Sequence, residues 1–115
     1  MKLYADYIKE REDKDCVYNE NTFIIYKVYD DIVSLIDIYS KPEIRGTTKT
    51  YGFLMKFLRK LKDDGIKIAY GYTDENTHNW KKSEKIMLQF GFKKLGKLNE
   101  DKTYNNYVLN LQEIL

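Results

Sequence analysis

The chain is poor in the residues that cross-link small proteins. It contains one cysteine, Cys16, and one histidine, His78, among 115 residues. A single thiol forms no internal disulfide, and these two side chains fall short of the four ligands of a structural zinc site. The absences predict a protein of the cytoplasm that folds around an apolar core and needs no metal.

Long apolar runs are also missing. No segment approaches the ~18 consecutive apolar residues of a membrane span, and the N-terminus lacks the apolar core of a signal peptide. These absences exclude a membrane partner at the level of sequence. A length of 115 residues predicts a single domain, 1–115.

Charge is unevenly distributed along the chain. Residues 1–44 hold 6 Lys and Arg against 10 Asp and Glu, whereas residues 45–115 hold 14 against 8. The basic part suits an anionic ligand bound by the second half, although lysine-rich helices also carry solvated charge without any ligand. A net charge of +2 and the absence of a recognisable motif argue against a nucleic-acid partner.

Hydrophobic periodicity predicts three helices and six strands. We expect helices over 2–13, 48–64 and 80–90, and strands over 16–18, 22–28, 32–40, 66–72, 92–98 and 104–111. A strand, a helix and an adjoining strand over 32–72 form a βαβ unit, so the two strands should be parallel. The fold class is α/β, of the α+β kind, with a mixed twisted sheet flanked by about three helices.

The segment from Asp37 to Leu54 is predicted to end a buried strand, turn at Pro42, and begin an amphipathic helix. Thr47 or Thr48 is the expected N-cap of that helix. Free backbone N–H groups and the helix dipole make such a helix start suitable for an anion. Arg45 and Lys49 add full positive charges beside it.

Several side chains near this turn are candidates for chemistry. Asp37 interrupts an apolar strand, which suits either a general base in a cleft or a hydrogen-bonded carboxylate at a strand end. Asp74 and Glu75 are alternative bases or ordinary loop charges. Strand tyrosines at 39, 70 and 72 either line an acceptor slot or serve packing.

Two motifs resemble the GNAT N-acetyltransferase superfamily. Ile-Tyr-Ser-Lys-Pro-Glu-Ile-Arg-Gly at 38–46 is similar to the strand end that leads into the family's pyrophosphate loop. Ser-Glu-Lys-Ile-Met-Leu-Gln-Phe-Gly-Phe at 83–92 is similar to the family's second signature, a helix ending in Gly-Phe. The segment 6–11 also resembles compact GNAT-like proteins of phages, which would place the protein in a host cytoplasm.

The resemblance implies a GNAT fold, acetyl-CoA as co-substrate, and direct attack of an amine acceptor on the acetyl group. It implies that a strand edge at Ile38, Tyr39 and Ser40 binds pantetheine. The pyrophosphate loop would comprise Arg45, Gly46, Thr47, Thr48, Lys49 and Thr50, with Asn79 as a further contact. Asp37 would be the catalytic base. The acceptor stays open between a small amine and a protein, and a homodimer is common in this fold.

The sequence departs from the family pattern at three positions. Thr48 and Thr50 stand where the loop has glycines, and Thr tolerates left-handed backbone angles poorly. If Thr48 and Thr50 have helical backbone angles, glycine is not needed at either position. Met87 stands where the family often has a proton-donating tyrosine. These departures support an alternative function, a non-catalytic GNAT-fold protein that binds and modulates a protein partner.

Overall fold

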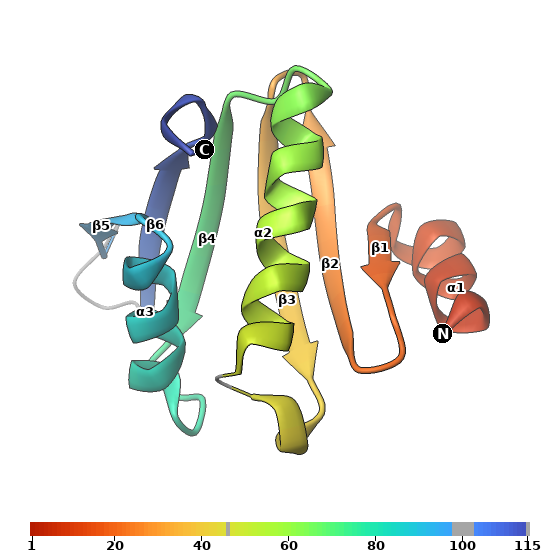
Figure 1. The fold of residues 1–115 in the computed structure, drawn as a ribbon, viewed down its shortest axis with the longest axis horizontal. Helices are drawn as coiled ribbons and strands as arrows, with labels where there is room; N and C mark the ends of the chain where they lie inside the picture. Colours follow the sequence, from red (N-terminus) through yellow and green to blue (C-terminus); the bar gives the residue numbers. More distant parts are fainter. Residues whose placement is uncertain (46, 98–102, 115) are drawn as a thin grey trace.

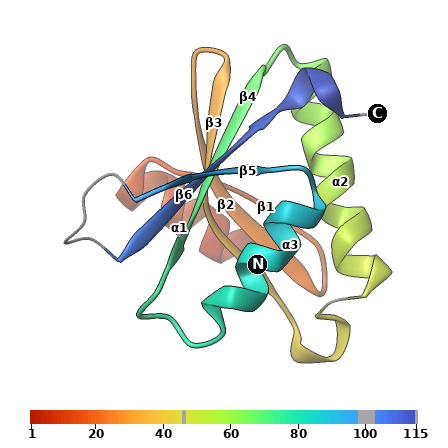
Figure 2. The same cartoon turned by 90° about the vertical axis from the view of Figure 1, so that its left-hand side faces the viewer.

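The computed structural model describes residues 1–45, 47–97 and 103–114. Six strands form one mixed sheet in the order β1-β2-β3-β4-β6-β5 (Figure 1). All neighbouring strands are antiparallel except β3 and β4, which are parallel. Helices α2 and α3 lie on one face of the sheet and α1 lies on the other (Figure 2).

The order of elements agrees with the order predicted from sequence. The helices are α1 (Lys2–Glu12), α2 (Thr48–Asp63) and α3 (Trp80–Gln89), with short 3-10 turns η1 (Pro42–Ile44) and η2 (Leu111–Glu113). The strands are β1 (Asp15–Tyr18), β2 (Thr22–Tyr29), β3 (Ile32–Ser40), β4 (Ile68–Asp74), β5 (Lys93–Gly96) and β6 (Tyr104–Asn110). The α+β fold and the parallel βαβ unit are therefore confirmed. Strand β5 is shorter than the predicted strand over 92–98, and residues 98–102 lie outside the described residues.

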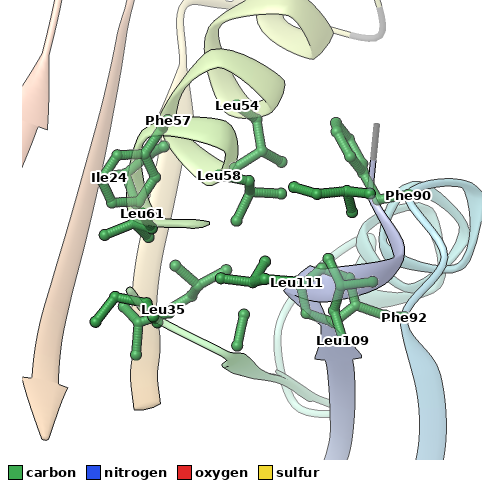
Figure 3. Close-up of a cluster of buried hydrophobic side chains, with 14 of the residues drawn as sticks. Ile24, Leu35, Leu54, Phe57, Leu58, Leu61, Phe90, Phe92, Leu109 and Leu111 are labelled. Carbon is green, nitrogen blue, oxygen red and sulfur yellow. The ribbon is translucent and has the colours of Figure 1, made fainter. Parts of the chain in front are cut away.

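Helix α2 provides the centre of the core. Its buried residues recur at helical spacing, at Leu54, Phe57, Leu58 and Leu61, and face the sheet. They meet side chains of the strands, of the end of α3 and of the C-terminal segment in one cluster (Figure 3): Ile24, Leu35, Phe90, Phe92, Leu109 and Leu111. The helix is followed by Gly65 at φ +94°, a left-handed angle that suits glycine at a helix end.

Three expectations need correction. Strand β4 begins at Ile68 rather than at residue 66 and extends to Asp74. The apolar pattern of the helix predicted over 80–90 would turn Ile86 inward, but 38% of this residue is exposed. The run 32–40 was expected to be covered on both faces, yet three consecutive residues near its end, Asp37–Tyr39, are exposed. The sheet opens at this point, as described below.

No helix within the described ranges is long and apolar enough to cross a membrane.

Candidate active site

Strands β3 and β4 separate after a short parallel contact. Their register covers only three pairs, from Ile32 opposite Ile68 to Ser34 opposite Tyr70. Beyond these pairs the strands diverge toward their C-terminal ends (Figure 1). Each strand keeps its outer neighbour, since β3 still pairs with β2 and β4 with β6. The inner edges of 35–40 and 71–74 thus offer strand N–H and C=O groups to an extended ligand.

The wide end of this opening leads to the turn before α2. Arg45 donates from Nε to the carbonyl of Ser40 at 2.8 Å, and its guanidinium carbon lies 5.1 Å from the ring centroid of Tyr39. Both contacts hold the side chain against the end of β3. The terminal guanidinium nitrogens are not used by these contacts, and the residue is exposed. Arg45 is thus positioned to bind an anion at the turn.

Hydroxyl groups fix the turn to the sheet. Thr50 Oγ1 donates to the carbonyl of Ile44 at 3.0 Å and lies 3.1 Å from Ser40 Oγ. Ser40 Oγ in turn lies 3.0 Å from Thr22 Oγ1 on β2, and both residues are buried. Thr47 also donates its hydroxyl to the carbonyl of Ile44. These threonine hydroxyls therefore serve the architecture of the turn.

Helix α2 begins at Thr48, with Thr47 as the N-cap residue. This position confirms one of the two predicted N-caps, although the Thr47 side chain makes no capping hydrogen bond. Thr48 and Thr50 have helical backbone angles, so neither residue needs the left-handed conformation that would demand glycine. The first amides of an α-helix have no acceptor within the helix, and they point out of its N-terminus. Gly46 lies outside the described residues.

Positive charge surrounds the start of α2. A surface hollow of about 440 Å³ runs along its first turns. It is lined by Asn19, Asn21, Ile44, Thr48, Lys49, Gly52, Phe53 and Lys56. Lys49 and Lys56 lie on the same side of the helix, one above the other, since they are seven residues apart. Their charges add to the helix dipole at this end.

Asp37 lies on β3, beside the opening, on the face of the sheet that carries α1. It is exposed, and it makes no ion pair or side-chain hydrogen bond with any residue that the structure describes. Burial, followed by the charge of Asp37, raises the pKa of Tyr4 on α1 and of Tyr72 on β4. The Asp37 carboxylate therefore has no side-chain partner among the described residues, and its charge acts on tyrosines of two other elements.

The alternative bases, Asp74 and Glu75, both have hydrogen-bond partners. Asp74 Oδ1 accepts hydrogen bonds from the Thr103 hydroxyl at 3.0 Å and the Asn76 amide at 2.9 Å. Glu75 pairs with Lys97 at 2.6 Å and accepts a bond from Asn105, and these bonds lower the pKa of its carboxyl. A lowered pKa makes Glu75 a weaker proton acceptor.

Asn79 occupies a separate position. It is the N-cap residue of α3, with φ 64°, and its side chain makes no capping bond. No hydrogen bond joins Asn79 to the turn before α2 within the described ranges. The structure brings together the strand end, Arg45 and the start of α2, whereas Asn79 lies at the start of a different helix, α3.

A polar network beneath α3 was not anticipated from the sequence. The Tyr107 hydroxyl donates to Glu84 Oε2 and lies 2.9 Å from Thr73 Oγ1. Glu84 also pairs with Lys94 at 2.8 Å. Burial and the bond to Glu84 raise the pKa of Tyr107 to about 12, and the bonds from Lys94 and Tyr107 lower the pKa of Glu84. The network holds α3 on the end of β4.

Met87 lies one turn after Glu84 on α3 and packs against β4. Its terminal methyl group lies against Gly71, where a Cβ would clash with it. The side chain has no proton to donate, and it is half-buried against the core. No cluster of three or more potential metal ligands occurs in the part of the chain that the structure describes.

Comparison with solved structures identifies the architecture. The PaiA N-acetyltransferase of Thermoplasma acidophilum, in complex with coenzyme A, superposes with a TM-score of 0.72. The two sequences are 17% identical, and the match covers 95% of this chain and 69% of that one. The ribosomal-protein-S18-alanine N-acetyltransferase of Escherichia coli gives a TM-score of 0.67 at 15% identity, covering 96% and 76% of the two chains.

A Bacillus subtilis acetyltransferase in complex with CoA gives a TM-score of 0.64 at 12% identity, covering 91% of this chain and 82% of that one. By sequence, the chain matches no protein-family model and no curated protein. Identities this low establish a shared fold and leave the chemistry to be argued from the site. The six-stranded mixed sheet with three helices is the fold of GNAT acetyltransferase structures.

Proposed function

We propose that the protein is an acetyl-CoA-dependent N-acetyltransferase that acts on a primary amine. One observation carries the proposal: the parted edges of β3 and β4 lead directly to the free N-terminus of α2, with Arg45 beside it. An extended chain with an amide backbone suits the strand edges. A pyrophosphate suits the helix start. Two proteins of this fold were solved in complex with CoA, which supports CoA as the kind of ligand.

In this arrangement Ile38, Tyr39 and Ser40 would present the edge of β3 to pantetheine. The amides of residues 48–50, Arg45 and Lys49 would bind the pyrophosphate. The threonine hydroxyls keep the turn in place through Ile44 and Ser40. Asn79 stays a prediction, since it lies on a different helix end.

Transfer then needs a proton acceptor near the attacking amine. The amine nitrogen forms a bond to the acetyl carbon, the carbon–sulfur bond breaks, and the sulfur leaves as a thiolate. Asp37 takes the proton lost by the amine. With Met87 at the usual donor position, the thiolate gains its proton from water, which we expect to slow turnover by ~10²-fold relative to a tyrosine.

Calorimetric titration of acetyl-CoA into the purified protein tests the proposal. We expect saturable binding that weakens about 10- to 100-fold in Arg45→Ala, because a charged contact to phosphate contributes about 1.5–3 kcal/mol. Arg11→Ala is the matched control, since it removes the same charge from exposed α1. Unchanged affinity in Arg45→Ala would remove Arg45 from the site. Release of CoA thiol on addition of amines then tests for transfer.

The second candidate is a non-catalytic protein that uses the same fold to bind and modulate a protein partner. Met87 favours it, because a thioether occupies the position expected for a proton donor. This function predicts no heat with acetyl-CoA and a stable complex with another protein. Turnover of acetyl-CoA with any amine would refute it.

A further inference from the structure

Three aromatic rings form a column that leads from α1 to the end of β3. Tyr4 of α1 meets Phe23 of β2 edge to face, with ring centroids 5.7 Å apart and an interplanar angle of 65°. Phe23 in turn stacks on Tyr39 of β3, at 5.5 Å and 24°. Phe23 and Tyr39 are direct partners in the register of the two strands. Ring pairs at these separations attract one another beyond the apolar area that they bury.

Arg45 completes the column at the turn before α2. Its guanidinium carbon lies 5.1 Å from the centroid of the Tyr39 ring, within the range of a cation–π contact. Its Nε donates to the carbonyl of Ser40 at 2.8 Å. The ring and the carbonyl together restrict the directions that the guanidinium can take. They leave the N–H groups of its two terminal nitrogens to a ligand.

Both ends of the column are exposed. Tyr4 and Tyr39 are 42% and 44% exposed, and Arg45 lies at the surface. Burial alone therefore does little to fix these side chains, and their position depends on contacts with one another. A free surface arginine samples many rotamers, so ordering it when a ligand binds costs affinity. Rings that order Arg45 in advance would remove part of this cost.

We propose that Tyr39, Phe23 and Tyr4 are positioning residues that hold Arg45 ready for an anion. The inference rests on the proposed function, in which the anion is the pyrophosphate of acetyl-CoA. Tyr39 acts directly on the guanidinium, Phe23 acts through Tyr39, and Tyr4 acts through Phe23. The effect of each ring therefore decreases with its distance from Arg45. Through these contacts α1 contributes to anion binding at the start of α2.

Calorimetric titration of acetyl-CoA into single variants measures what each ring contributes. Tyr39→Leu should weaken binding about 3- to 10-fold, the cost of ordering one long side chain, while the main-chain groups of β3 remain. Tyr39→Phe should bind like the wild type, because the ring remains. Phe23→Leu should weaken binding about threefold and Tyr4→Ala about twofold. Tyr7→Ala is the matched control, since Tyr7 lies on the same helix, is 56% exposed and has no ring contact with any described residue.

A double variant separates positioning from direct contact with the ligand. In the Arg45→Ala background, Tyr39→Leu should cause no further loss of affinity, because no guanidinium is left for the ring to hold. Equal losses in the two backgrounds would overturn the inference, since the ring would then act on the ligand or on the strand edge itself. Circular dichroism confirms that each variant is folded.

The order of Arg45 is also measured in the free protein. In ¹⁵N NMR the Nε–H signal of Arg45 reports both the bond to Ser40 and the ring current of Tyr39. We expect this proton to be protected from exchange with water in the wild type and in Tyr39→Phe, and to lose this protection in Tyr39→Leu. Arg11 of α1 is the reference, because its side chain is 67% exposed. A signal of Arg45 that stays unchanged in Tyr39→Leu would contradict the inference.

The outcomes separate the inference from the proposed function. If the wild type gives no heat with acetyl-CoA, the acetyltransferase is refuted, and the NMR signal of Arg45 alone decides whether the rings order its side chain. Affinity that falls in Arg45→Ala but not in Tyr39→Leu supports the proposed function and overturns the inference. Affinity that falls in both, with no added loss in the double variant, supports both.

Discussion

Replacing Tyr107 by Phe tests whether the buried network under α3 holds the wall of the site. Tyr107 is fully buried, and its hydroxyl joins Thr73 on β4 to Glu84 on α3. The phenol donates its hydrogen bond to Glu84, so the Thr73 hydroxyl must donate a hydrogen bond to the phenol oxygen. The substitution removes one oxygen and both hydrogen bonds, while the ring and its packing remain.

The cost follows from what each partner loses. A hydrogen bond to a carboxylate contributes about 1.5–3 kcal/mol, and Glu84 keeps its pair with Lys94, which limits that loss. Thr73 is 4% exposed, and its hydroxyl would be left without its partner, at a cost of about 1–3 kcal/mol. We therefore expect the free energy of unfolding to fall by about 3 kcal/mol, a sizeable share of a domain's stability.

Thermal unfolding followed by circular dichroism measures this change. For 115 residues the entropy of unfolding is about 0.24 kcal/mol per kelvin, so Tm should fall by about 12 °C. Tyr104→Phe is the control, because that phenol is exposed and its loss should cost under about 0.5 kcal/mol.

The double variant Thr73→Val/Tyr107→Phe leaves no orphaned hydroxyl at position 73. It should be less destabilised than the sum of the two single changes. A fall in Tm of only two or three degrees for Tyr107→Phe, or strictly additive effects, would refute a coupled network.

The remaining predictions concern pH, the turn and the proton donor. The pKa of Tyr107 is raised to about 12 from about 10. The stability that its protonated hydroxyl contributes is therefore present below pH 10 and is lost as the pH rises to 12. In denaturant titrations, the free energy of unfolding of the wild type should therefore fall by about 3 kcal/mol more than that of Tyr107→Phe over this pH interval. Parallel plots of the two free energies against pH would contradict the raised pKa. Thr50→Val should lower stability by about 1–2 kcal/mol and weaken acetyl-CoA binding, whereas Thr50→Ser, which keeps the hydroxyl, should do neither. Met87→Tyr should raise turnover about 10- to 100-fold if proton donation limits transfer, and unchanged kcat would place the slow step elsewhere.

Local patterns predicted the fold well because they agree with one another along most of the chain. The stripe of α2, Gly65 after its end and the strand that follows define the βαβ unit within one stretch of sequence. The Asp30 turn and the alternation beside it define the β2–β3 hairpin. Such features depend on residues that are close together in the sequence, so a single sequence is enough to predict them.

The exposed end of β3 could not be predicted in this way. Its apolar run reads like that of a buried central strand, and β3 does lie in the middle of the sheet. The neighbouring strand moves away after Ser34, and the register of β3 against β2 shifts between Ile25 and Tyr26. Both features depend on partners distant in sequence. Tyr107 was missed for the same reason, since its partners Thr73 and Glu84 lie on other elements.

The threonines at 48 and 50 illustrate how a site can keep its geometry with different residues. Glycine is needed where a loop must take left-handed angles, but here the helix already begins at Thr48. The amides can then point outward from ordinary helical residues. What must be held is the position of the helix start, and Thr50 does so through Ile44 and Ser40. A glycine at position 50 would leave these bonds unmade. Threonine therefore stabilises the very helix start that the proposed pyrophosphate contact requires, so the two departures from the glycine pattern are compatible with cofactor binding, whereas Met87 bears on the rate of transfer.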